Sequence, residues 1–146
     1  MSPKELTPQD VHKVMTTNPA AVYLDVRTVA EFASGHPRGK VVNIPIVFHH
    51  PTTQETYPNN SFLEVVESLY AKDAQIIAGC DNGERSRQAA NQLLRAGYAN
   101  VCVMLDGYPG WKAQKLPTTT DNRNGISYVS LLTPVKRKGK KKVTHA

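Results

Sequence analysis

Seven consecutive residues combine a nucleophile, a candidate anion receptor and a turn-forming glycine. They read Cys80-Asp81-Asn82-Gly83-Glu84-Arg85-Ser86. A cysteine thiolate is a strong nucleophile, and a helix N-terminus or a neighbouring cation stabilises it. Arginine offers a planar fork of N–H donors that suits a tetrahedral oxyanion, and glycine lets the backbone curl so that successive N–H groups point inward. The segment therefore predicts nucleophilic covalent catalysis by Cys80.

The residues on either side of this segment predict how it is positioned. Residues 75–79 form an apolar run of strand length, and the residues after Ser86 have helical periodicity up to Gly97, a typical helix end. In parallel α/β sheets, ligands bind at the carboxyl ends of strands, where strand-to-helix loops present free N–H groups. We therefore expect residues 81–86 to surround the Cys80 sulfur, Arg85 to attract an anionic substrate, and Ser86 to cap the helix and donate to the sulfur or the substrate.

Apolar runs of strand length alternate with amphipathic helical segments along most of the chain. Helix-capping signatures occur at Thr7, Thr28 and Ser61, and residues 46–60 are polar and predicted to form a long loop. This alternation predicts an α/β fold of three layers, with a mostly parallel central sheet flanked by helices on both faces. The predicted strands are 21–26, 41–45, 75–79 and 101–104, and a short last helix is predicted at 108–114.

Charge and composition divide the chain into three parts. Residues 1–116 are expected to form the catalytic domain, 117–134 a polar extension with an apolar patch that can dock on it, and 135–146 a basic mobile tail. The net charge is +6, from 18 Lys and Arg against 12 Asp and Glu. Six of the basic residues lie in the acid-free segment 136–142, so the remaining charges balance. Any acidic partner, such as nucleic acid or a membrane surface, would therefore bind the tail.

Other residues with chemical potential favour structural roles. Asp25 and Arg27 follow a predicted strand at the same sheet edge as Cys80, and we expect an ion pair that supports the site rather than a catalytic pair. Cys102 lies within an apolar strand, which favours core packing, with a resolving thiol as the alternative. The adjacent His49 and His50 in a polar loop do not have the spacing of a zinc site, so neither a metal nor a cofactor is predicted.

Several ordered motifs occur within residues 5–116: Leu24-Asp25-Val26-Arg27 with Glu31-Phe32, Gly35-His36, Asn43-Ile44-Pro45, the 80–86 segment, and Gly107 with Trp111. Together they resemble the rhodanese family in its small single-domain form. The resemblance implies a sheet of about five strands and a cysteine that takes sulfane sulfur from thiosulfate, holds it as a persulfide, and passes it to cyanide or a thiol. It assigns the persulfide to Cys80 and contact with the anionic donor to Arg85.

The sequence also departs from this family pattern. Residues 36–40 and Asp106 differ from the usual motifs but do not touch the nucleophile. Asp81 and Glu84 are acids within the loop itself, and they would repel a dianion such as thiosulfate if they face the pocket. The donor could then be another sulfane, such as a protein persulfide.

Three functions remain under comparison. The first is a sulfurtransferase with a small anionic sulfur donor and a thiol or cyanide acceptor. The second is a rhodanese-fold regulatory or protein-binding module with a basic tail. The third, a phosphatase or arsenate reductase, is disfavoured because such enzymes place five residues between cysteine and arginine, whereas four separate Cys80 from Arg85. The amino end has no secretory signal and no run of 18 apolar residues, so a cytoplasmic protein without an integral membrane segment is expected.

Overall fold

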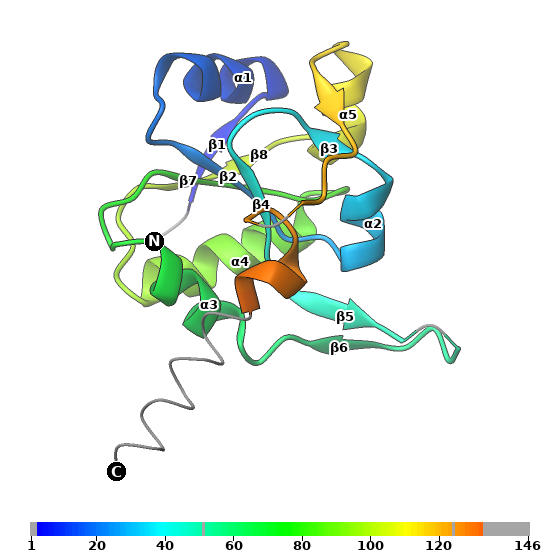
Figure 1. Ribbon diagram of the computed structural model, residues 1–146. Coiled ribbons are helices and arrows are strands. Elements are labelled where there is room, and N and C mark those ends of the chain that lie inside the picture. Colours follow the sequence, from blue (N-terminus) through cyan, green and yellow to red (C-terminus); the bar gives the residue numbers. More distant parts are fainter. Residues whose placement is uncertain (1–2, 51, 124, 133–146) are drawn as a thin grey trace.

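A five-stranded parallel sheet forms the centre of the computed structural model, which describes residues 3–50, 52–123 and 125–132. Every residue of its middle strands β2, β7 and β8 is buried, because helices cover both faces. The strand order is β1-β8-β7-β2-β4 (Figure 1). These strands are β1 (Lys4–Leu6), β2 (Val22–Asp25), β4 (Val41–Asn43), β7 (Ile76–Gly79) and β8 (Val101–Met104).

Five helices form the two outer layers. Apolar side chains of α3 and α4 pack on one face of the sheet, and those of α1, α2 and α5 pack on the other (Figure 1). The predicted three-layer α/β fold is confirmed. The helices are α1 (Pro8–Thr17), α2 (Val29–Ser34), α3 (Phe62–Leu69), α4 (Glu84–Arg95) and α5 (Gly107–Ala113).

Two of the four predicted caps form as expected. The Thr7 hydroxyl accepts the Asp10 N–H at the start of α1, and Thr28 and Glu31 form a reciprocal capping box on α2. The prediction for Ser61 is wrong in detail, because its side chain makes no capping hydrogen bond. Instead, its N–H donates to the side-chain oxygen of Asn59. The prediction that Ser86 caps its helix is also wrong, because Gly83 is the N-cap residue of α4, which has no side-chain capping hydrogen bond. The Ser86 hydroxyl donates to the Gly83 carbonyl at 3.0 Å.

The predicted long loop at 46–60 is wrong. These residues contain an antiparallel hairpin of β5 (Val47–His49) and β6 (Thr56–Pro58) that projects beside α2. Strand β1 was not predicted, because its three residues at the sheet edge include two exposed, charged side chains rather than an apolar run. Each of these strands has only three residues, which is too few for hydrophobic periodicity to reveal it.

The extension after α5 returns to the body of the domain. Strand β9 (Thr118–Thr119) pairs antiparallel with β3 (His36–Pro37), and the indole Nε1–H of Trp111 donates to the Pro117 carbonyl. Farther along, Tyr128 and Leu131 are buried in the core beside α3 and α4. The division at 116 stays a prediction, and residues 133–146, including the predicted basic tail, lie outside the described part of the chain.

We expect Leu131→Ala to lower the free energy of unfolding by about 2–4 kcal/mol, because it removes a buried side chain from the core. Val129→Ala is the matched control: Val129 is 68% exposed on the same segment, and its truncation should cost less than about 0.5 kcal/mol. Urea unfolding measures both changes. A change in unfolding free energy for Leu131→Ala as small as that for Val129→Ala would show that burial of Leu131 does not stabilise the domain.

Candidate active site

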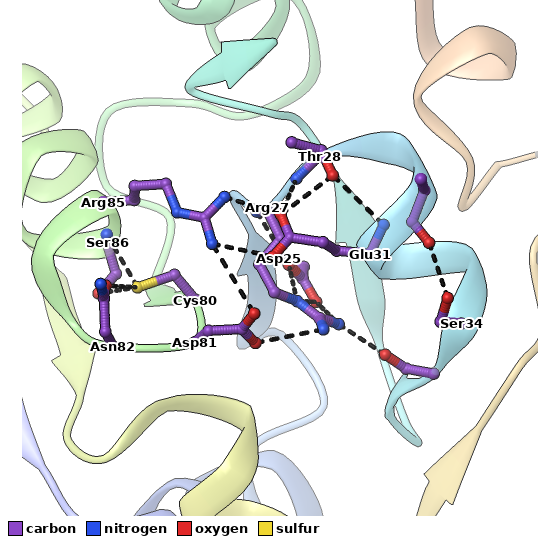
Figure 2. A network of polar contacts seen from close by, with 12 residues as sticks. Asp25, Arg27, Thr28, Glu31, Ser34, Cys80, Asp81, Asn82, Arg85 and Ser86 are labelled. Atoms are coloured by element: carbon purple, nitrogen blue, oxygen red, sulfur yellow. Dashed lines mark hydrogen bonds and ion pairs between the residues drawn. The ribbon is translucent and has the colours of Figure 1, made fainter. Parts of the chain in front are cut away.

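Cys80 directly follows β7, at the carboxyl end of a central strand of the sheet. Its sulfur accepts hydrogen bonds from the N–H groups of Gly83, at 3.0 Å, and Ser86, at 3.3 Å. The Ser86 hydroxyl oxygen lies 3.3 Å from the sulfur, and Asn82 Oδ1 lies 3.8 Å from it (Figure 2). The chain can turn this tightly because Gly83 has a left-handed backbone, with φ of 85°. The 80–86 segment therefore encloses the sulfur, and Cys80 is fully buried.

The hydrogen bonds around the sulfur favour a negative charge on it. The two N–H donors come from the turn before α4 and from its first turn, where backbone N–H groups carry partial positive charge. Such donors stabilise a thiolate, and they would equally stabilise a persulfide anion one atom farther out. The arrangement can therefore hold sulfur in its nucleophilic form.

Arg85 makes contacts that the sequence did not predict. Its guanidinium donates to both oxygens of Glu31, at 2.8 and 3.1 Å, and lies 3.8 Å from Asp81. In Figure 2 it is turned toward these carboxylates, whereas the Cys80 sulfur is turned toward Asn82 and Ser86. The expected contact of Arg85 with an anionic donor thus competes with an existing ion pair.

Glu31 is a site residue that the sequence analysis missed. Glu31 belongs to the capping box at the start of α2, and that role alone explains a glutamate at this position. However, the carboxylate that accepts from the Thr28 N–H also binds Arg85. Although burial acts against its charged form, hydrogen bonds from Arg85 are chief among the contacts that hold the pKa of Glu31 well below its ordinary value of 4.5.

Asp25 and Arg27 form a buried ion pair beside the loop, which matches their expected structural role. Arg27 Nη2 lies 2.8 Å from Asp25 Oδ2 and also donates to the Gly35 carbonyl at 2.6 Å. Arg27 Nη1 reaches Asp81 at 3.5 Å, so Asp81 lies between two guanidinium groups. Asp25 is paired with Gly79 in the β2–β7 register, which places this ion pair at the base of the loop.

The start of α5 supports the loop from behind. The Tyr108 N–H donates to the Cys80 carbonyl at 2.8 Å, and a side chain on Gly107 would overlap the carbonyl oxygens of Cys80 and Asp81. The Tyr108 ring also lies against the Arg27 guanidinium, 4.6 Å from its centroid. These contacts give a structural reason for glycine at position 107.

Cys102 packs in the core, as predicted. Burial raises the pKa of its thiol to about 11, which disfavours a thiolate. Both cysteines are free, and they belong to hydrophobic clusters on opposite faces of the sheet. This separation argues against the alternative of a resolving thiol.

The described residues contain no group of three or more His, Cys, Asp or Glu side chains that could hold a metal ion. His49 lies at the end of β5, where its Nε2 is 2.9 Å from the Gln54 side-chain oxygen. Within the same described part of the chain, no helix is long and apolar enough to span a membrane.

Comparison with known proteins decides the family. A model of the rhodanese-like domain matches residues 7–114. The chain belongs to the rhodanese-like family. Among relatives of this rhodanese-like chain, thiosulfate sulfurtransferase 18 of Arabidopsis thaliana is 41% identical over 100 residues, covering 68% of this chain and 72% of the relative. Thiosulfate sulfurtransferase GlpE of Haemophilus influenzae is 37% identical over 120 residues, covering 82% and 98%.

A longer relative and a solved structure also match this chain. Senescence-associated protein DIN1 of Raphanus sativus is 40% identical over 95 residues, covering 65% of this chain, which spans only half of that relative. The crystal structure of Rv0390 from M. tuberculosis superposes with a TM-score of 0.69 at 25% identity, covering 83% of this rhodanese-like chain and all of that one. These matches confirm the fold and the family that the motifs predicted.

We expect Gly107→Ala to destabilise the protein for two reasons, backbone strain at residue 107 and overlap of the new methyl group with the Cys80 loop. Gly107 and Gly97 both have positive φ, at 58° and 101°, so an alanine at either position costs about 1–2 kcal/mol. Only at Gly107 does the added methyl group meet loop backbone, which should add about 1–3 kcal/mol and slow modification of the Cys80 thiol. Urea unfolding and the rate of Cys80 alkylation measure both effects, with Gly97→Ala as the control. Equal behaviour of the two variants would contradict the support role of α5.

Glu31→Gln should lower the free energy of unfolding by about 1–2 kcal/mol at pH 7, because a charged hydrogen-bond acceptor is lost from Arg85. The pKa of Glu31 is lower in the folded state than its ordinary value of 4.5, so its contribution is complete above that value and is lost as the pH falls below it. The difference from wild type should therefore shrink between pH 5 and about pH 3. Glu64→Gln, which replaces an exposed first-turn acid of α3, is the control. A difference that stays constant with pH would refute this assignment.

Proposed function

We propose that the protein is a sulfurtransferase that carries sulfane sulfur as a persulfide on Cys80. Sulfur would come from thiosulfate or another persulfide donor and pass to cyanide or a thiol. The observation that carries this proposal is the convergence of the Gly83 and Ser86 N–H groups on the Cys80 sulfur. The names of the Arabidopsis and Haemophilus relatives support the same reaction class.

The proposed reaction has two displacements. The Cys80 thiolate attacks the outer sulfur of thiosulfate, a bond forms between the two sulfurs, and sulfite leaves with the electron pair of the broken S–S bond. An acceptor thiolate or cyanide then attacks the outer sulfur of the persulfide, and the Cys80 thiolate is regenerated. The N–H donors of residues 83 and 86 stabilise the anionic sulfur at both stages.

The other loop residues have supporting roles in this proposal. Asn82 and Ser86 place polar atoms beside the sulfur. Arg85 and Arg27, held by Glu31 and Asp25, fix the loop through Asp81. The short spacing between Cys80 and Arg85 leaves a ring suited to one sulfur atom, so we expect no turnover of a chromogenic phosphate ester. Cytoplasmic location and an acidic partner for the tail stay predictions of the sequence.

The decisive measurement is intact mass after incubation with thiosulfate or with an alkyl persulfide. Wild type and Cys102→Ser should each gain one sulfur atom that a reductant removes, because Cys102 is buried in the core. Cys80→Ser should gain none. Gain of the sulfur by Cys80→Ser would refute the assignment, and failure of the wild type with every donor would favour the alternative of a rhodanese-fold binding module.

A further inference from the structure

The Cys80 loop and the residues beside it carry more negative than positive charge. Both guanidinium groups beside the loop are already bound by carboxylates: Arg85 by Glu31 and Arg27 by Asp25. Asp81 contacts both guanidinium groups. Glu84 adds a further, exposed carboxylate in the first turn of α4. The loop and its immediate surroundings therefore hold four carboxylates and two guanidinium groups.

Neighbouring cations do not reverse this balance beside Asn82, whose side-chain oxygen lies 3.8 Å from the sulfur. Arg87, the next basic residue of α4, donates to Glu5 of β1 at 2.7 Å. Lys112 lies over the Tyr108 ring, with its Nζ 4.8 Å from the centroid, and lines a separate hollow with Arg27 and Asp81.

A larger hollow, of about 690 Å³, opens between α2, the Cys80 loop and the β5–β6 hairpin. Asn82, whose side-chain oxygen is 3.8 Å from the sulfur, lines it. Its charged walls are Glu31, Glu84 and Arg85, and Arg85 is neutralised by Glu31. A donor that enters here meets a net negative potential, because a concave site concentrates the field of its wall charges.

We infer that Glu84 determines donor specificity, with Glu31 neutralising Arg85: the uncompensated carboxylate disfavours dianions such as thiosulfate and selects a persulfide whose carrier is positively charged near the sulfur. This inference rests on the proposed persulfide chemistry of Cys80 and concerns only the donor. The shared chemistry is an alkyl persulfide, R–S–SH, and its source is either a basic peptide segment or a small molecule.

The transfer balances without an oxidant or a reductant. The Cys80 thiolate attacks the outer sulfur of R–S–SH, a new S–S bond forms between the Cys80 sulfur and that outer sulfur, and the S–S bond of the donor breaks. The R–S⁻ thiolate leaves with the electron pair and takes the proton released by the new Cys80 persulfide. A cationic R group is attracted to the Glu84 side of the hollow before and after this step.

The test compares rates of sulfur loading on Cys80 for matched donors. Two peptide persulfides of one sequence carry flanking lysines or flanking glutamates, and free cysteine persulfide and thiosulfate are the small donors. The lysine peptide should load wild type at least about tenfold faster than the glutamate peptide. Added salt should slow the lysine peptide and speed thiosulfate, because it screens attraction and repulsion alike.

Glu84→Lys should reduce or reverse the ratio of the loading rates for the lysine and glutamate peptides. It should also raise the rate of loading from thiosulfate about tenfold. Glu64→Lys makes the same charge change in the first turn of α3 and should leave the rates as in wild type. If free cysteine persulfide loads Cys80 at least as fast as the lysine peptide does, the preferred donor is a small molecule. If it loads Cys80 more slowly, the preferred donor is a peptide.

The outcomes separate this inference from the proposed function. Equal rates for the two peptides, or a glutamate peptide that loads faster, would overturn the charge selection while sulfur transfer by Cys80 stands. Effects of Glu64→Lys as large as those of Glu84→Lys would show that only net charge matters and would also overturn it. Failure of Cys80 to load with any of the four donors would instead refute the sulfurtransferase itself.

Discussion

The two backbone N–H groups that converge on the Cys80 sulfur impose the main constraint on this fold. Backbone donors can point at one atom only if the chain between β7 and α4 turns within a few residues. Such a turn leaves its own carbonyl groups to be bound from outside, and the Tyr108 N–H binds that of Cys80. The position of α5, and the absence of a side chain at Gly107, follow from this need.

A second consequence is the network of charges around the loop. A buried ion such as Arg27 is stable only with a partner, here Asp25. Glu31 completes the helix cap of α2 and also holds Arg85, so one side chain ties a helix start to the loop. These ion pairs also affect the chemistry of the site, because arginines that are bound by carboxylates attract an incoming anion less strongly.

The sequence predicted the elements that hydrophobic burial determines. Residues 21–26, 75–79 and 101–104 are apolar runs because helices cover both faces of their strands. The sequence did not predict β1 or the β5–β6 hairpin, because these strands have three residues each and depend on backbone pairing rather than on an apolar run of strand length. In the site, the order of Cys80, Gly83 and Ser86 predicted their convergence. The Arg85–Glu31 pair was missed because it joins residues 54 positions apart, which no local pattern records.

The position of Trp111 makes its fluorescence sensitive to two parts of the structure. It is the single tryptophan of the chain, fully buried on α5, with Tyr23 of β2 6.4 Å away between ring centroids. Its indole N–H binds the first part of the extension, while the helix that carries it binds the Cys80 carbonyl through Tyr108. Tryptophan emission therefore comes from one position that connects the nucleophile loop to the C-terminal extension, and it reports on both without an added label.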